Sequence, residues 1–288
     1  MTTPTPEPPS DAPTDSIAAT VEALLAPRRQ PVGMDLVVVG AGEMGRWFAR
    51  ASGADAVAFA DVDPGAARAA ADAIEGARTT PLDGDETFDA VCVAVPMAVV
   101  PEAIATHADR ATDAVVDVSG EMGESVAALA EHATGRERAS FHPLFAADNA
   151  PGNVPVVVDR DGPVVEGIRD SLSAAGNRVF ETTPDEHDRA METVQAKAHT
   201  AVLAYALAAE DVDPRFHTPL SAPLSELTDQ VTGTTPGVYA DIQARFDGGD
   251  AVADAARELA AADPETFRAL YEAAAGPSTT EGPGNADR

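Results

Sequence analysis

Cysteine, lysine and long apolar runs are scarce in this chain of 288 residues, and each scarcity narrows the class of protein. The single cysteine, Cys92, cannot form an internal disulfide, and no spacing of cysteine and histidine predicts a zinc site or any other metal site. No apolar run reaches the roughly 18–20 residues that a membrane helix needs. The first residues also lack the basic start and apolar stretch of a secretory signal. We therefore expect a cytoplasmic protein without membrane contact.

Positive charge is scarce as well. The chain has 48 Asp and Glu residues against 19 Lys and Arg residues, giving a net charge of −29, and Lys197 is its single lysine. Such a surface repels nucleic acid and anionic membranes, so we expect neither as a partner. Because the acidic residues are spread along the whole chain, we interpret them as adaptation to a salt-rich cytoplasm, where the screening length falls to roughly 3 Å at 1 M salt. The competing interpretation, an acidic partner-binding surface, would be favoured by a localised acidic block, and none stands out.

The distribution of apolar residues divides the chain into four segments. We expect a disordered N-terminal extension over 1–33, an α/β domain over 34–182, a helical domain over 183–276 and a disordered tail over 277–288. Met34 stands directly before the first expected strand, so translation could begin there as well as at Met1.

Strands and helices alternate in the second segment, which favours a parallel, doubly wound sheet. Strands are expected at Met34–Val39, Ala56–Ala60, Ala90–Val95, Ala114–Val118, Ala139–His142, Val154–Val158 and Arg178–Glu181. Helices are expected at Glu43–Ser52, Pro64–Ile74, Ala98–His107 and Glu121–His132.

No strand signal returns after Thr183. One long helix is expected over Pro184–Glu210, followed by helices at Leu220–Val231, Pro236–Phe246 and Asp250–Ala274. This domain is too small and too rich in alanine to bury its apolar faces alone, so we expect it to pair with a second copy in a homodimer. The predicted fold class is α/β, a Rossmann-type doubly wound sheet followed by an all-helical C-terminal dimerisation domain.

A GxGxxG motif follows the first expected strand and opens the first helix, in the order Gly40, Ala41, Gly42, Glu43, Met44, Gly45. In a dinucleotide-binding fold the first glycine permits a tight turn, the second lets the backbone approach a pyrophosphate, and the third lets the helix pack closely on the strand. The pyrophosphate then lies at the helix N-terminus. The motif predicts that 34–182 is an NAD-binding Rossmann domain.

Asp61 ends the second strand about 20 residues after the first glycine, where a ribose-binding acid is expected. A carboxylate there favours NAD and repels the 2′-phosphate of NADP. Val95 and Pro96 end a later strand at the same edge, where Pro96 is either a wall beside the cofactor or a strand terminator. Two alternatives stay open, a glycine-rich turn that binds nothing and a Rossmann domain that uses FAD or a nucleoside donor.

His142 lies at a strand end within the run FHPLF, on the same edge of the expected sheet. Histidine suits proton transfer because its ordinary pKa lies near neutrality. The alternative is a surface or core histidine without a chemical role.

Several segments resemble the prephenate dehydrogenase (TyrA-type) family over about residues 34–245. The chain is similar to a haloarchaeal member in its charge and in the segment YADIQ. The resemblance is carried by Gly40–Gly45, His142–Phe145, Thr183–Asp188, Gln195 with His199, and Tyr239–Gln243.

The resemblance implies NAD-dependent oxidative decarboxylation of prephenate to 4-hydroxyphenylpyruvate in tyrosine biosynthesis, with arogenate as a close alternative substrate. It implies that His142 binds the 4-hydroxyl group and withdraws its proton as hydride departs. Ser119 is similar to a serine that lies near this hydroxyl and the nicotinamide in the family. His187, in the first turn of the long helix, is expected to be structural.

Gln195 and His199 are four residues apart, so we expect them to share a helix face at the cleft between the domains. His199 either positions the substrate or caps a buried polar network. Prephenate is a dianion and needs cations, which arginine supplies best. The family's arginine is missing here, where the chain has Gln230–Gly233. The candidate substitutes are Lys197, Arg189, Arg215 and Arg245, and Lys197 is either a substrate ligand or a helix-surface charge.

Two other function classes remain open. One is another two-domain NAD(P)-dependent reductase, of the pyrroline-carboxylate, imine or β-hydroxyacid type. The other is a non-catalytic NAD-binding regulator on the same scaffold.

Overall fold

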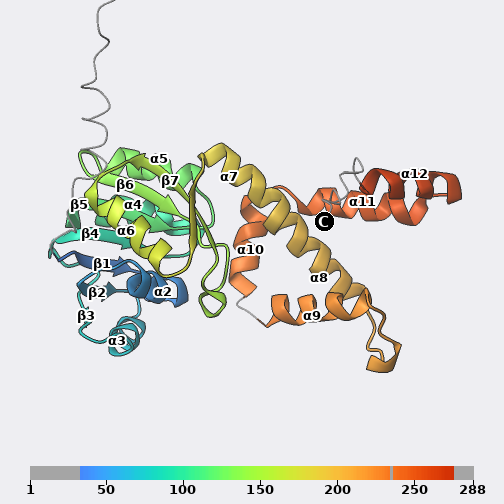
Figure 1. The fold of residues 1–288 in the computed structure, drawn as a ribbon, viewed down its shortest axis with the longest axis horizontal. Coiled ribbons are helices and arrows are strands. Elements are labelled where there is room, and N and C mark those ends of the chain that lie inside the picture. Colours follow the sequence, from blue (N-terminus) through green and yellow to red (C-terminus); the bar gives the residue numbers. More distant parts are fainter. Residues whose placement is uncertain (1–32, 234–235, 276–288) are drawn as a thin grey trace, which may run out of the picture.

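The computed structural model describes residues 33–233 and 236–275, which form a sheet-bearing part and a helical part (Figure 1). Except for Gly33, the extension expected at 1–33 and the tail expected at 277–288 lie outside these residues. No helix among the described residues is both long and apolar enough to cross a membrane.

One eight-stranded sheet organises the first part, in the order β3-β2-β1-β4-β5-β6-β7-β8. The strands are β1 (Asp35–Val39), β2 (Ala56–Ala60), β3 (Arg78–Thr79), β4 (Phe88–Val93), β5 (Ala111–Val118), β6 (Glu137–Phe141), β7 (Asn153–Arg160) and β8 (Arg178–Glu181). Every neighbouring pair is parallel except β6 and β7, which are antiparallel. The expected parallel, doubly wound sheet is therefore present, with this one antiparallel pair that was not expected from the sequence. The connection from β6 to β7 contains only a short 3-10 turn (Ala147–Asn149), whereas a parallel pair needs a longer crossover.

The strand order reverses at β1, which lies between β2 and β4. In sheets of this kind, ligands bind at the carboxyl ends of the strands on either side of the reversal. The glycine motif and Pro96 both come directly after strands that end at this edge.

Helices cover both faces of the sheet (Figure 1). One face is packed by α2 (Glu43–Ala51), α3 (Pro64–Asp72) and α6 (Pro163–Ala174), and the other by α4 (Val100–His107) and α5 (Gly123–His132). Helix α6 is not among the helices expected from the sequence. The order of strands and helices from β1 through α5 matches the expectation, with ends that differ by a few residues, except that the two-residue strand β3 is not among the expected strands.

The second part is helical throughout its described residues. It contains α7 (Pro184–Met191), a π-helical segment η4 (Glu192–Lys197), α8 (Ala198–Ala208), α9 (Ser221–Thr232), α10 (Pro236–Arg245), α11 (Gly249–Ala261) and α12 (Pro264–Ala274). The single helix expected over Asp250–Ala274 is wrong, because it is two helices. Asp263 caps α12, with its carboxylate accepting from Thr266 N at 2.8 Å, and Pro264 disfavours a helical conformation in the residue before it.

Candidate active site

The glycine turn after β1 requires glycine at two positions. Gly40 has φ +103°, and a Cβ atom there would lie 2.2 Å from the carbonyl oxygen of Ala94. A Cβ atom at Gly45 would lie 2.1 Å from the carbonyl oxygen of Gly40. With no side chain at these two glycines, the start of α2 can lie close against the ends of β1 and β4.

Gly42 is exposed and forms the N-cap of α2, without a side-chain hydrogen bond to the first turn. A Cβ atom at Gly42 would meet no atom within 4 Å, so open space faces this helix N-terminus. Unpaired amides and the helix dipole make such a position favourable for a phosphate group. The turn therefore fits the pyrophosphate of a dinucleotide.

Asp61 follows β2 beside this turn. Its Oδ2 accepts from Ala41 N at 2.7 Å, and its Oδ1 accepts from Asp63 N at 2.8 Å. The carboxylate is thus held at the edge where a ribose would follow the pyrophosphate.

The other expected cofactor residues surround the turn in different ways. Glu43 accepts a hydrogen bond from Ala147 N at 2.8 Å, which joins the turn to the loop after β6. Met44 packs against the core, and the half-buried Val95 faces Gly40. Pro96 is exposed at the start of the 3-10 turn Met97–Val99.

His142 directly follows β6 and is buried, with 7% of its surface exposed. Its Nδ1 lies 2.8 Å from His187 Nε2, and His187 Nδ1 lies 2.7 Å from Asp188 Oδ1. Asp188 also accepts from Met122 N and Gly123 N, both at 3.1 Å. A line of three polar side chains therefore runs from the end of β6 through α7 to the N-terminus of α5.

Burial is the main reason why the pKa of His142 falls from 6.5 to about 3; His187 lowers it further and Asp188 opposes the change. Burial acts to raise the pKa of Asp188. The hydrogen bonds from His187, Met122 and Gly123 outweigh burial, so the net change is a lowered pKa. Asp188 is therefore ionised and His142 is neutral near neutral pH.

The other ring nitrogen of His142 faces a different group of residues. The amide Nε2 of Gln195 lies 3.4 Å from His142 Nε2, and a Cβ atom at Gly120 would lie 3.7 Å from it. The same Cβ atom would lie 2.8 Å from Met97 Sδ. Gln195 Oε1 is buried without a hydrogen-bond partner among the described residues. His142 Nε2 is therefore the ring nitrogen that His187 does not engage.

Ser119 lies next to Gly120, and its hydrogen bonds go to groups other than the His142 ring. It is buried, its N donates to Phe141 O at 3.1 Å, and its Oγ accepts from Glu121 N at 3.3 Å. Its backbone thus pairs with the residue before His142, while the hydroxyl bonds within its own loop.

His199 packs on the ring of Tyr239 in α10, whereas Gln195 contacts His142. The ring of His199 packs on Tyr239 with centroids 4.7 Å apart, and its buried Nδ1 has no hydrogen-bond partner among the described residues. Burial lowers the pKa of His199.

The side chain of Lys197 lies toward Gly248 at the start of α11. A Cβ atom built at Gly248 would lie 3.1 Å from Cγ of Lys197.

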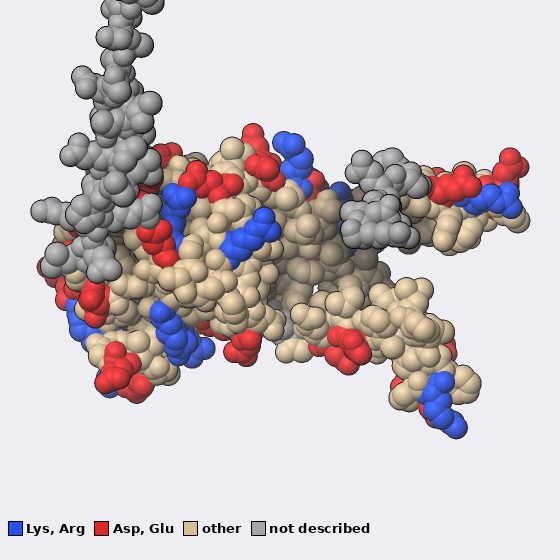
Figure 2. Space-filling model, viewed as in Figure 1, with Lys and Arg blue, Asp and Glu red and all other residues tan. Residues whose placement is uncertain are grey.

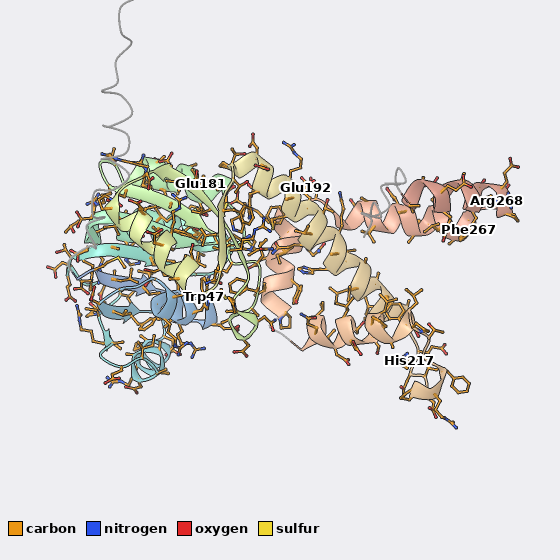
Figure 3. The ribbon with its side chains drawn as sticks, in the orientation of Figure 1. Trp47, Glu181, Glu192, His217, Phe267 and Arg268 are labelled. Carbon is orange, nitrogen blue, oxygen red and sulfur yellow. The ribbon has the colours of Figure 1, made fainter. Side chains whose placement is uncertain are left out.

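Arg245 forms a hydrogen bond and an ion pair with acidic side chains near the site. Its guanidinium donates to Glu121 Oε2 at 3.1 Å and forms an ion pair with Glu124. These residues belong to a cavity of about 340 Å³ where the sheet-bearing part meets α7 and η4, beside the position of Glu192 in Figure 3. The cavity is lined by Glu121, Glu124, Asp188, Glu192, Arg245, Phe246 and Asp247. Of the other expected cations, Arg215 is mostly exposed and pairs with Asp213, and Arg189 is exposed.

His187 and Asp188 are the site residues that the sequence does not reveal. The sequence predicts a structural role for His187 and assigns no role to Asp188. The family-like segment Thr183–Asp188 contains both and was the available signal, but their contact with His142 depends on how α7 packs against α5.

Comparison with known proteins supports this interpretation of the fold. No family model matches the chain. A curated relative, the 4-amino-4-deoxyprephenate dehydrogenase of Streptomyces pristinaespiralis, is 30% identical over 271 residues, covering 83% of this chain and 89% of the relative. The structure of prephenate dehydrogenase from Aquifex aeolicus with hydroxyphenyl propionate and NAD+ has a TM-score of 0.63 at 18% identity, covering 84% and 96% of the two chains. Synechocystis arogenate dehydrogenase has a TM-score of 0.53 at 17% identity, covering 84% and 98%. The expected Rossmann-type α/β fold is confirmed.

Proposed function

Because the chain belongs to the prephenate and arogenate dehydrogenase family, we propose that it catalyses the NAD-dependent oxidative decarboxylation of prephenate to 4-hydroxyphenylpyruvate in tyrosine biosynthesis. The observation that carries this proposal is the position of His142. It follows β6 at the same sheet edge as the glycine turn, with Nε2 toward Gly120 and Gln195.

The cofactor assignment is supported by the open N-terminus of α2 at Gly42 and by the carboxylate of Asp61. Gly40 and Gly42 would hold the pyrophosphate, and Asp61 would accept hydrogen bonds from the ribose hydroxyls. The same carboxylate would repel a 2′-phosphate, which favours NAD over NADP. When bound, NAD supplies the hydride acceptor of the reaction.

His142 acts on the 4-hydroxyl group of the substrate. Its Nε2 withdraws the hydroxyl proton as C4 loses hydride, and the ring becomes aromatic once CO₂ leaves C1. Gln195 would orient the ring of His142, and the absence of a Cβ atom at Gly120 lets Met97 and this ring pack against the loop after β5. Ser119, Lys197 and His199 stay candidates for binding the substrate.

A second substrate is favoured by the name of the 30% identical relative, which acts on 4-amino-4-deoxyprephenate. That molecule carries an amine where prephenate carries the 4-hydroxyl group, so His142 Nε2 would face the amine. Arogenate is a third candidate.

A steady-state assay of NADH formation in molar KCl tests these proposals. Prephenate, arogenate and 4-amino-4-deoxyprephenate are compared, each with NAD and with NADP. We expect turnover of prephenate with NAD, and we expect His142→Asn to lower kcat by about 10²–10⁴-fold while NAD affinity is kept. The control is His132→Asn, which changes a partly exposed histidine on α5. NAD binding without turnover of any of the three substrates would overturn the proposal in favour of a non-catalytic regulator.

We also propose that the helical part forms a homodimer. Helix α8 has the sequence AHTAVLAYALA, yet none of its residues is buried. A helix that is apolar on most of its surface is normally buried. A second copy is the simplest cover for it.

A further inference from the structure

We propose that His187, and not His142, holds the proton released by the substrate, and that Asp188 is the positioning residue that makes this possible. The inference rests on the proposed function, because it concerns the same reacting hydroxyl group. It assigns roles to two residues of α7 that lie beyond direct reach of the substrate side of His142.

The hydrogen-bond directions follow from Asp188. Its carboxylate is ionised and accepts from Met122 N and Gly123 N, so it can only accept from His187 as well. His187 Nδ1 therefore carries a hydrogen atom and donates it to Asp188 Oδ1 across 2.7 Å.

In neutral His187, the remaining nitrogen, Nε2, has a free lone pair. The 2.8 Å contact then requires His142 Nδ1 to carry the hydrogen atom and donate it. His142 Nε2 is left as an acceptor on the side of Gln195 and Gly120, which is the state that a general base needs. Asp188 thus sets the tautomer of His142 through His187.

The two imidazoles differ in how well they can carry positive charge. A proton kept on His142 would create a buried cation whose nearest carboxylate lies beyond His187, and burial already holds the pKa of His142 at about 3. A proton on His187 instead creates a cation in direct contact with the Asp188 carboxylate. The proton therefore enters His142 at Nε2 and leaves it at Nδ1.

The step balances without any additional reactant. The substrate O–H bond breaks and an N–H bond forms at His142 Nε2, while the N–H bond at His142 Nδ1 breaks and one forms at His187 Nε2. His142 stays neutral in its other tautomer, and His187 becomes an imidazolium ion. After CO₂ leaves, the ring oxygen is a phenolate, and the same transfers run backwards to give the phenol.

Other charged groups are packed around Asp188. The cavity beside Asp188 carries four further carboxylates and one guanidinium group, contributed by the loop before α5, by α5, by η4, by the end of α10 and by the loop after α10. These groups are Glu121, Glu124, Glu192, Asp247 and Arg245. On α7 itself, Asp185 and Glu186 add negative charge and Arg189 adds positive charge.

Nitrogen NMR of the full chain, labelled with ¹⁵N-histidine and free of substrate, tests the tautomers directly. We expect His142 to be protonated at Nδ1 and unprotonated at Nε2, with its signals identified by their loss in His142→Asn. A His142 protonated at Nε2 would overturn the inference. This readout needs no turnover, so its failure would leave the proposed function standing, whereas absent turnover with the expected tautomers would count against the proposed function alone.

Kinetics of Asp188→Asn provide the second test. An amide can donate to His187 Nδ1, which reverses both hydrogen bonds and leaves His142 protonated at Nε2. We expect kcat to fall by about 10²–10⁴-fold with KM and NAD affinity unchanged, as for carboxylate-to-amide changes in other histidine-based sites. Glu131→Gln, which alters an exposed carboxylate on α5 outside this cavity, should keep the kcat of the unaltered protein. If both variants keep it, the inference is wrong.

His187→Gln covers the case in which Asp188→Asn fails to fold. The glutamine oxygen can accept a hydrogen bond from His142 Nδ1, so the tautomer of His142 is kept. The imidazole that would hold the proton is removed. We expect a lower kcat and a changed dependence of kcat on pH. An unchanged kcat and pH profile would contradict the inference.

Discussion

Asp117 is a buried acid that the proposed chemistry does not use. It lies in β5 with no exposed surface, and neither carboxylate oxygen has a hydrogen-bond partner at ordinary distance among the described residues. Burial raises its pKa well above 3.8, and the nearby hydroxyl groups of Ser140 and Ser125 offset only part of that effect. The folded protein therefore keeps Asp117 protonated at pH values where the unfolded chain has lost the proton.

This difference predicts the effect of Asp117→Asn on stability. Because the folded-state pKa is raised, the contribution of Asp117 is fully present below pH 3.8 and declines as the pH rises towards the folded-state value. The asparagine variant should be more stable than the unaltered protein at pH 7, and the difference should shrink below pH 4. Urea unfolding in molar KCl at both pH values measures this gain. Asp72→Asn, at an exposed position of α3, is the control, and an equal gain at both pH values would contradict the prediction.

At the scale of elements, the predictable units are those whose signal is local. The run from β1 through the glycine turn into α2 combines a buried strand, three glycines and a helix within residues 35–51, and the structure matches the prediction there. The antiparallel direction of β7 has no local signal, because strand direction depends on the connection and on the partner strand. Pro264 indicates a helix break in the sequence. The alanine-rich pattern on both sides favours one continuous helix and therefore led to the wrong prediction.

The candidate site was predictable to a similar extent. His142 and Gln195 can be named from their own segments. The contact between His142 and His187 joins residues 45 positions apart, and no spacing rule reports it. It exists because Asp188 accepts from the first amides of α5 and so fixes α7 beside the end of β6.

Arg245 links α10 to α5, which predicts a measurable loss when it is removed. Glu121 is 8% exposed and accepts from Arg245, so Arg245→Gln leaves a largely buried carboxylate without its cation. We expect the free energy of unfolding to fall by roughly 1–3 kcal/mol, as for other hydrogen bonds to charged groups. Arg268→Gln, on α12 far from the sheet in Figure 3, is the matched control. Equal losses in the two variants, measured by urea unfolding, would show that the link contributes nothing.

At the scale of the whole molecule, the helical part extends away from the sheet as two arms, one of α8 and α9 and one of α11 and α12 (Figure 1). Much of the first arm is neither acidic nor basic in Figure 2, although the chain carries a net charge of −29. Large apolar side chains lie exposed on both arms. They include Leu207, Phe216, Leu220, Leu227, Leu259, Phe267 and Tyr271.

These surfaces predict the oligomeric state. Light scattering in molar KCl should give twice the mass of the 29.5 kDa chain, and Leu207→Glu should shift the protein towards monomer. Leu207 is 89% exposed in the single chain, and Val62 on the sheet-bearing part is 87% exposed. Val62→Glu is therefore a matched control that should keep the dimer. A monomer in the unaltered protein would refute the proposal.

The π-helical segment Glu192–Lys197 has a consequence that reaches beyond the site. It holds Gln195 against His142, and α8 continues directly from it into the arm that carries Leu207. An α-helix turns by about 100° per residue, so deleting one residue within this segment would swing the whole arm around its axis by about that angle. The same six residues thus fix both where the Gln195 amide meets the His142 ring and which side of the arm is turned outward, so a change of helical register there would alter both.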